Sequence, residues 1–266
     1  MPKLYIESGY FPSGLPFNRF GRGARTLIIF QGLAFENKPL DGLSVRSYLG
    51  MVLFLQDEFT VVAASRRPGL PAGYEMKDMA QDYADMVRAE FGAPVDVMGT
   101  STGGSIAQHF AADHPELVRR LVIHSAAHTL GPVGREVQLK IGELARQGKW
   151  REASAVLLRL IVHPGPAAPL IVTLGSSVMS LSAPRDPSDL IITVEAEDRH
   201  AFRDRLADIR APTLVIAGAA DPFYTEALFR ETAAGIPGAS LILYPGMGHP
   251  AAGRQFEADL LSFLKS

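Results

Sequence analysis

A serine lies between two glycines in the sequence Gly99-Thr100-Ser101-Thr102-Gly103. The apolar run at 95–98 before this motif is typical of a buried strand, and the small residues after it favour a helix. On a sharp turn between a strand and a helix, a serine hydroxyl stands clear of the sheet, where a base and a substrate can reach it. We therefore predict that Ser101 is a nucleophile. The alternative is a glycine-rich turn with an incidental serine.

A serine nucleophile needs a base, and the base needs a carboxylate to orient it. Asp221 follows the apolar run at 213–217, and His249 follows the run at 240–244. Because the carboxyl ends of parallel strands meet at one edge of a sheet, we predict that Asp221 and His249 approach Ser101 there. Taken singly, Asp221 could instead start a turn or cap a helix, and His249 could be an ordinary loop histidine.

Attack on a carbonyl group places negative charge on its oxygen, which requires hydrogen-bond donors. We predict that the backbone N–H groups of Thr102 and Leu33 form this oxyanion hole, with Ala34 as the second choice for Leu33. Gly32 permits an unusual backbone in the same loop, although a plain glycine turn is the alternative. We also expect Gly32, Ala34 and His128 to contact the substrate.

The other histidines do not complete this arrangement. His124 and His128 follow the strand-like run that begins at residue 120, and we interpret both as lining or packing groups. The remaining four are interpreted as surface, core or insertion residues: His109, His114, His163 and His200. No cluster of His, Asp and Glu has the spacing of a metal site, so we expect neither a metal nor a cofactor.

Apolar segments alternate with helical patterns along most of the chain. The strand-like segments are 4–10, 17–24, 26–30, 59–64, 95–98, 120–124, 213–217 and 240–244, and the first two are joined by a turn at 12–14. Helical patterns occupy 45–56, 74–91 and the residues after Ser101. This alternation predicts the α/β class, with a mostly parallel, eight-stranded sheet and helices on both faces.

Residues 131–207 break the alternation. They contain helical patterns at 137–146, 150–162 and 191–205, with proline-rich turns and no convincing strand. We predict a helical insertion over the sheet at 131–207, with residues 1–130 and 208–266 forming the core.

Composition excludes several classes of protein. The net charge is −2, which offers no basic footprint for nucleic acid. The chain has no cysteine, which excludes disulfides and fits a reducing compartment, so we predict a cytoplasmic protein. The apolar region 153–183 contains Arg159, His163 and three prolines, which leave no piece long enough to cross a bilayer. We therefore expect a small-molecule substrate and no membrane partner; the residues leave the oligomeric state open.

Taken together, the strand succession, the serine turn, the late aspartate and histidine and the insertion resemble the α/β-hydrolase superfamily over nearly the whole chain. The resemblance implies that Ser101 is the nucleophile, His249 the base and Asp221 the orienting acid beneath a helical cap. The sequence looks most like the single-cap esterases, lactonases and carbon–carbon bond hydrolases.

The sequence departs from the family pattern at three places. Gln31-Gly32 stands where the family often has His-Gly, and Thr102 replaces the commoner Met, Leu or Gln. The segment 64–69 keeps an arginine and the final glycine of the family's Asp-x-Arg-Gly-x-Gly pattern but lacks its aspartate. Because the serine turn has no nucleophilic aspartate, dehalogenase and epoxide hydrolase activities are not expected.

These observations predict a serine hydrolase that cleaves a small, mainly apolar ester, lactone or related carbonyl compound through an acyl-enzyme at Ser101. The apolar preference rests on the many Leu, Ile, Val and Ala residues of 131–207, which could equally serve only to attach the insertion. Two other classes stay open. One is a weakly catalytic ligand-binding or signalling protein, and the other is a lyase or a cofactor-free haloperoxidase-like enzyme of the same fold.

Overall fold

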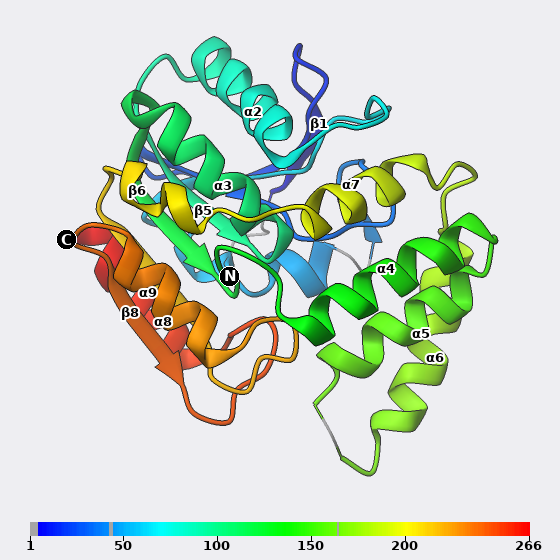
Figure 1. Ribbon diagram of the computed structural model, residues 1–266. Coiled ribbons are helices and arrows are strands. Elements are labelled where there is room, and N and C mark those ends of the chain that lie inside the picture. Colours follow the sequence, from blue (N-terminus) through cyan, green and yellow to red (C-terminus); the bar gives the residue numbers. More distant parts are fainter. Residues whose placement is uncertain (1–4, 43–44, 164) are drawn as a thin grey trace.

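The computed structural model describes residues 5–42, 45–163 and 165–266 (Figure 1). Within them, one eight-stranded sheet has the strand order β1-β2-β4-β3-β5-β6-β7-β8. The strands are β1 Glu7–Tyr10, β2 Pro16–Gly21, β3 Arg25–Phe30, β4 Phe59–Ala64, β5 Val95–Thr100, β6 Val118–His124, β7 Thr213–Gly218 and β8 Ser240–Tyr244. β2 pairs antiparallel with β1 and β4, and every other pair is parallel. The predicted mostly parallel, eight-stranded sheet is therefore confirmed.

The strand boundaries follow the predictions closely in the centre of the sheet and less closely at its start. Leu4, the first residue of the first predicted strand, lies outside the described residues. β2 ends at Gly21 rather than at residue 24, because Gly21 has a φ of +83° and turns the chain. The central strands β3, β5 and β7 are buried as continuous runs, as expected of parallel strands that are covered on both faces.

Helices cover both faces of the sheet. On one face lie α2 (Met76–Glu90), α3 (Thr102–Asp113) and α8 (Glu226–Gly235), and on the other lies α9 (Arg254–Lys265). A single helix was predicted at 45–56, and this was wrong. The structure instead has a π-helix, η1 (Val45–Leu49), and a 3₁₀ turn, η2 (Leu53–Leu55), on the face with α9. The exposed Gly50 separates the two, since glycine disfavours a helix interior.

Among the described residues, four α-helices lie between β6 and β7 in the chain. They are α4 Pro132–Arg146, α5 Trp150–Ile161, α6 Ala168–Leu181 and α7 Ser188–Asp198. Figure 1 shows α4, α5 and α6 together at one end of the molecule, with α7 between them and α2. The helix predicted at 191–205 starts earlier and ends at Asp198, and a separate 3₁₀ turn, η4, follows at Arg203–Asp208.

The individual helix α6 was not predicted, because Gly175 and a series of serines lower its intrinsic helix propensity. The boundaries of the core and the insertion stay a prediction. No helix among the described residues has both the length and the apolar character needed to span a bilayer.

Candidate active site

Ser101 lies on a sharp turn between the end of β5 and the start of α3, with φ 53° and ψ −126°. A positive φ is strained for a residue with a side chain and recurs at functional sites. Glycine is required at positions 99 and 103 because backbone atoms of neighbouring segments lie very close to both. A Cβ atom on Gly103 would lie 2.0 Å from the carbonyl oxygen of Phe30, and one on Gly99 would lie 2.4 Å from the carbonyl oxygen of Gly103. Strand, turn and helix could not pack this closely with larger residues.

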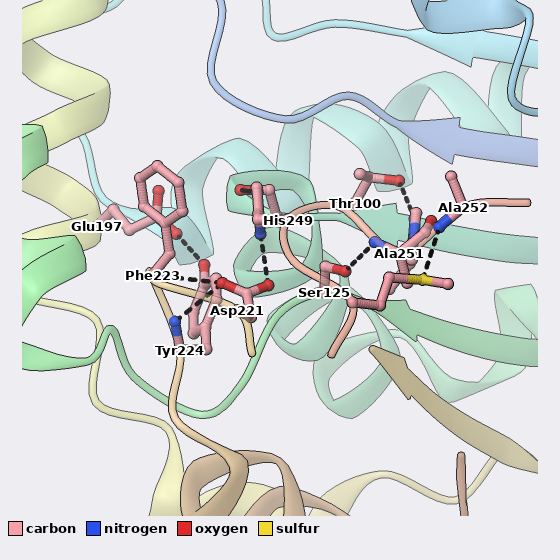
Figure 2. A network of polar contacts seen from close by, with 12 residues as sticks. Thr100, Ser125, Glu197, Asp221, Phe223, Tyr224, His249, Ala251 and Ala252 are labelled. Atoms are coloured by element: carbon pink, nitrogen blue, oxygen red, sulfur yellow. Dashed lines mark hydrogen bonds and ion pairs between the residues drawn. The ribbon is translucent and has the colours of Figure 1, made fainter. Parts of the chain in front are cut away.

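The structure brings Ser101, His249 and Asp221 within hydrogen-bonding distance. His249 Nε2 lies 3.0 Å from Ser101 Oγ, and His249 Nδ1 lies 2.7 Å from Asp221 Oδ2. The other carboxylate oxygen, Oδ1, accepts hydrogen bonds from the backbone N–H groups of Phe223 at 2.8 Å and Tyr224 at 3.2 Å (Figure 2). A carboxylate beside Nδ1 favours the tautomer with the proton on Nδ1, which leaves Nε2 free to accept the serine proton.

The loops that carry Asp221 and His249 are fastened to each other. The N–H of Ala219 donates to the carbonyl of Tyr244 at 2.9 Å, and that of Ala220 donates to the carbonyl of Met247 at 3.0 Å. These bonds continue the pairing of β7 with β8 beyond Gly218, the last residue of β7. The imidazole and its carboxylate partner are therefore held by one hydrogen-bonded ladder.

The loop after β3 lies against Ser101. A Cβ atom on Gly32 would lie 3.3 Å from Ser101 Cβ, so only a small residue fits without displacement. The N–H of Thr102 is the first of α3 and has no acceptor within its own helix. That the N–H groups of Thr102 and Leu33 both point toward the oxyanion stays a prediction.

Arg66 supports this loop, a role that was not predicted from the sequence. Arg66 is 1% exposed, and its guanidinium donates to the carbonyl oxygen of Gln31 at 3.1 Å and to that of Gly32 at 3.1 and 3.2 Å. Burial lowers the pKa of Arg66, because water no longer stabilises its charge. The available signal was the arginine that the segment 64–69 keeps from the family pattern.

Two neighbouring pockets meet at His249. The smaller, of about 300 Å³, contains Ser101, and the larger, of about 890 Å³, lies between α5, α6 and the loops after β7 and β8. Ile161, His249 and Pro250 line both. Apart from Ser101 and His249, the smaller pocket is lined by Gly32, Leu33, Tyr48, Met51, Thr100, Gln138, Leu157, Ile161, Phe223 and Pro250. Its wall is mainly apolar.

Of the three predicted substrate-binding residues, the structure places only Gly32 at the smaller pocket. Ala34 and His128 are absent from the linings of both pockets. His128 lies against α8 instead, where its Nε2 is 3.3 Å from Glu231 Oε2 and its backbone N–H donates to Thr232 Oγ1 at 3.0 Å. The substrate contacts predicted for Ala34 and His128 stay predictions, and in the structure the ring of His128 lies beside Glu231 of α8.

A buried carboxylate connects α7 to α3 and to the loop after β7. Glu197 of α7 is 0% exposed, and its Oε1 accepts from Ser105 Oγ at 3.0 Å and from the Tyr224 hydroxyl at 3.1 Å. Its Oε2 accepts from Gln138 Nε2 at 3.3 Å. Burial raises the pKa of Glu197. Figure 2 places Glu197 beside Phe223 and Tyr224. Its local sequence carried no signal of this role.

No group of three or more His, Asp or Glu side chains in the part of the chain that the structure describes is arranged to hold a metal ion.

A family model described as the alpha/beta hydrolase family matches residues 42–258. The chain belongs to this family. Among curated proteins, it is 29% identical over 185 residues to one named "Putative carbamate hydrolase RutD" from Klebsiella pneumoniae (strain 342), covering 68% of each chain. It is 25% identical over 177 residues to a pimeloyl-[acyl-carrier protein] methyl ester esterase from Chromobacterium violaceum, covering 64% of this chain and 68% of the relative.

Solved structures share the fold of this alpha/beta hydrolase family member. A hydrolase from Pseudomonas aeruginosa PA01 superposes with a TM-score of 0.76 at 22% identity, covering 98% of both chains. The enol-lactonase from Burkholderia xenovorans LB400 superposes with a TM-score of 0.76 at 21% identity, covering 95% of this chain and 96% of the other. At this level of identity the likeness shows the fold alone.

Proposed function

We propose that this alpha/beta hydrolase family member is a serine hydrolase that cleaves esters, lactones or related carbonyl compounds through an acyl-enzyme at Ser101. The observation that carries the proposal is the chain of hydrogen bonds from Ser101 Oγ through His249 to Asp221, with distances of 3.0 and 2.7 Å. Such a chain lets a hydroxyl lose its proton as it attacks a carbonyl carbon.

In the first half of the reaction, Ser101 Oγ attacks the carbonyl carbon while His249 Nε2 accepts its proton. Asp221 stabilises the resulting imidazolium and is itself held in place by two backbone N–H groups. The imidazolium then protonates the leaving alcohol as the tetrahedral intermediate collapses to the acyl-enzyme. In the second half, His249 takes a proton from water as the water oxygen attacks the acyl carbon. The imidazolium then returns this proton to Ser101 Oγ as the bond between Oγ and the acyl carbon breaks, which releases the acid and restores Ser101.

The proposed oxyanion donors are the N–H groups of Thr102 and Leu33. The start of α3 adds the positive end of its helix dipole near Thr102. Leu33 shares its peptide unit with the carbonyl of Gly32, which accepts two bonds from the Arg66 guanidinium. A cation on the oxygen of a peptide unit polarises its N–H, so Arg66 should strengthen the Leu33 donor as well as position it.

The two pockets support the proposal that the acyl group and the leaving group of the substrate bind at different places. The smaller pocket, of about 300 Å³ and mainly apolar, suits a small apolar acyl group bonded to Ser101. The larger space is lined by Arg159 and His163 among apolar groups and suits a bulkier, more polar leaving group. We propose a cytoplasmic enzyme of this kind, in keeping with the cysteine-free sequence.

The decisive experiment uses Ser101→Ala with p-nitrophenyl acetate and a fluorophosphonate probe. We expect rapid labelling of Ser101 in the wild type, and no labelling and no turnover in the variant. Undiminished turnover in Ser101→Ala would reject the proposal. Folded wild-type protein without labelling would favour a ligand-binding role. Product analysis on a panel of an ester, a lactone and a carbamate separates hydrolysis from lyase or haloperoxidase-like chemistry.

A further inference from the structure

Residues 124 and 125, at the carboxyl end of β6, bond to the serine turn. The backbone carbonyl of His124 accepts a hydrogen bond from the N–H of Ser101 at 2.9 Å. The N–H of Ser125 donates to the carbonyl of Ile216 in β7 at 2.9 Å, which anchors the pair in the middle of the sheet. Any other group fastened to these two residues therefore has a fixed position relative to the nucleophile.

The ring of His124 bonds to the histidine loop. His124 Nε2 lies 2.8 Å from the carbonyl oxygen of Ala251, and Nδ1 lies 3.1 Å from Thr100 Oγ1. A carbonyl can only accept, so Nε2 carries the proton, and Nδ1 is left to accept from the Thr100 hydroxyl. The ring is 1% exposed and stacks on Phe256 with 4.7 Å between ring centroids. Burial lowers the pKa of His124 to about 4, which keeps the neutral ring that this pattern needs.

Ser125 bonds to the same loop residue from its other side. Its Oγ accepts a hydrogen bond from the N–H of Ala251 at 2.9 Å (Figure 2). Ser125 is fully buried and has a φ of 47°; Ser101 is the other non-glycine residue with positive φ among the described residues. Strain of this kind persists only where surrounding interactions hold it.

We propose that His124 and Ser125 are positioning residues that form a clamp on Ala251 and thereby set the distance between His249 and Ser101. The clamp holds both backbone polar groups of Ala251, two residues after His249. It fastens them to the strand end that also holds the N–H of Ser101. The inference rests on the proposed function, since it assigns the clamp the task of aligning the base with the nucleophile.

Two substitutions at Ser125 separate the hydrogen bond from the backbone strain. Ser125→Ala removes the hydroxyl and keeps the strain, whereas Ser125→Gly removes the hydroxyl and relieves the strain. We expect both to lower kcat for p-nitrophenyl acetate by about tenfold or more with KM nearly unchanged, because misplacement of a catalytic group acts on the chemical step. A glycine variant with wild-type kcat would assign the role to strain and overturn the clamp.

Two substitutions at His124 test the ring. His124→Leu removes both hydrogen bonds, whereas His124→Gln retains an N–H donor that can reach the carbonyl of Ala251. We expect the leucine variant to lose kcat and the glutamine variant to recover most of it. Equal activity in the two would contradict a role for the donor.

A proton resonance provides a readout that does not depend on turnover. The His249 Nδ1–H, bonded to Asp221 at 2.7 Å, should give a downfield signal that is assigned by its loss in His249→Asn. We expect this signal to broaden or shift in Ser125→Ala and His124→Leu. The matched controls are Ser154→Ala, whose buried hydroxyl donates to the carbonyl of Trp150 in its own helix, and His200→Leu, a second buried histidine.

The outcomes distinguish the clamp from the proposed function. Wild-type kcat and an unchanged His249 signal in both Ser125 variants would reject the clamp, even where Ser101→Ala is inactive. Turnover retained in Ser101→Ala, with a disturbed signal in the Ser125 variants, would reject the proposed function and leave the positioning of His249 standing. Equal losses of kcat in the two control variants would assign the effect to general stability and overturn the clamp.

Discussion

Two regions border the pockets and are held in place in different ways. One is the sheet edge at the ends of β5 to β8, and the other is the pair of helices α5 and α6. At the sheet edge, hydrogen bonds join residues far apart in sequence, such as His249 with Ser101 and Ala251 with Ser125. In α6, the side-chain bonds from Thr173, Ser176 and Ser177 all end on carbonyls of the same helix.

The side chains of the two regions also differ in their exposure to solvent. Ser101 and Asp221 are 9% and 7% exposed, whereas Leu170, Leu174 and Leu181 of α6 are 62%, 58% and 87% exposed. Chemistry requires atoms placed to within a few tenths of an ångström, and long-range bonds supply this placement. A wall that only excludes water and shapes a pocket tolerates looser attachment. The difference teaches that substitutions at the sheet edge should act on catalysis, and those of the exposed leucines of α6 should not.

The largest expected effect is at Asp221. Asp221→Asn should lower kcat by about 10⁴-fold with the fold intact, because an amide no longer favours the tautomer with the proton on Nδ1. Steady-state kinetics with p-nitrophenyl acetate measure kcat, and circular dichroism tests whether the fold is intact. Asp204→Asn, an exposed aspartate, is the control and should keep full activity. A kcat of the Asp221 variant near that of the wild type would contradict the expectation that substitutions at the sheet edge act on catalysis.

The next effect is at Arg66. Arg66→Met should lower kcat/KM by about 10²-fold, since it loosens and depolarises the peptide unit that carries the Leu33 N–H. The neighbouring Arg67→Met is the control, because Arg67 is 44% exposed and pairs with Asp82 at 3.8 Å. A boronic acid inhibitor, which forms a tetrahedral adduct, should lose affinity for the Arg66 variant in parallel. Unchanged inhibition would show that the loop does not depend on Arg66.

A smaller effect concerns stability and pH at Glu197. Burial raises its pKa in the folded state, so the folded protein binds more protons than the unfolded chain, and wild-type stability falls as pH rises above the unfolded pKa. Glu197→Gln cannot ionise. Its Tm relative to wild type should therefore increase from pH 5 to pH 8, as thermal denaturation would show. Glu195→Gln, with a side chain 46% exposed, should follow wild type throughout. A relative Tm of the Glu197 variant that falls with pH would contradict the raised pKa.

The smallest effect is expected on α6. Leu174→Ala should change the free energy of unfolding by no more than about 0.5 kcal/mol and leave kcat unchanged. Leu144→Ala on α4 is the contrasting variant, since Leu144 is 4% exposed and should cost about 2–5 kcal/mol. Urea denaturation measures both. A large loss of stability or activity in Leu174→Ala would show that α6 is held as tightly as the sheet edge.

Local patterns in the sequence were enough to predict the sheet and the meeting of Ser101, Asp221 and His249. A buried parallel strand is a continuous apolar run, and a serine turn needs small residues within a few positions, so both signals are complete within a short window. Parallel topology then brings the ends of distant strands to one edge.

Contacts between distant segments decided the rest. From the sequence, His128 was predicted to contact the substrate and His124 was not, yet the ring of His124 bonds to the carbonyl of Ala251 and the ring of His128 lies beside Glu231. Arg66 and Glu197 likewise gained their roles from partners elsewhere in the chain. Whether a polar side chain faces solvent, a helix or a catalytic loop depends on what packs against it. Those neighbours are assembled only when the chain folds, so the contacts through which these residues support the site were decided by the tertiary structure.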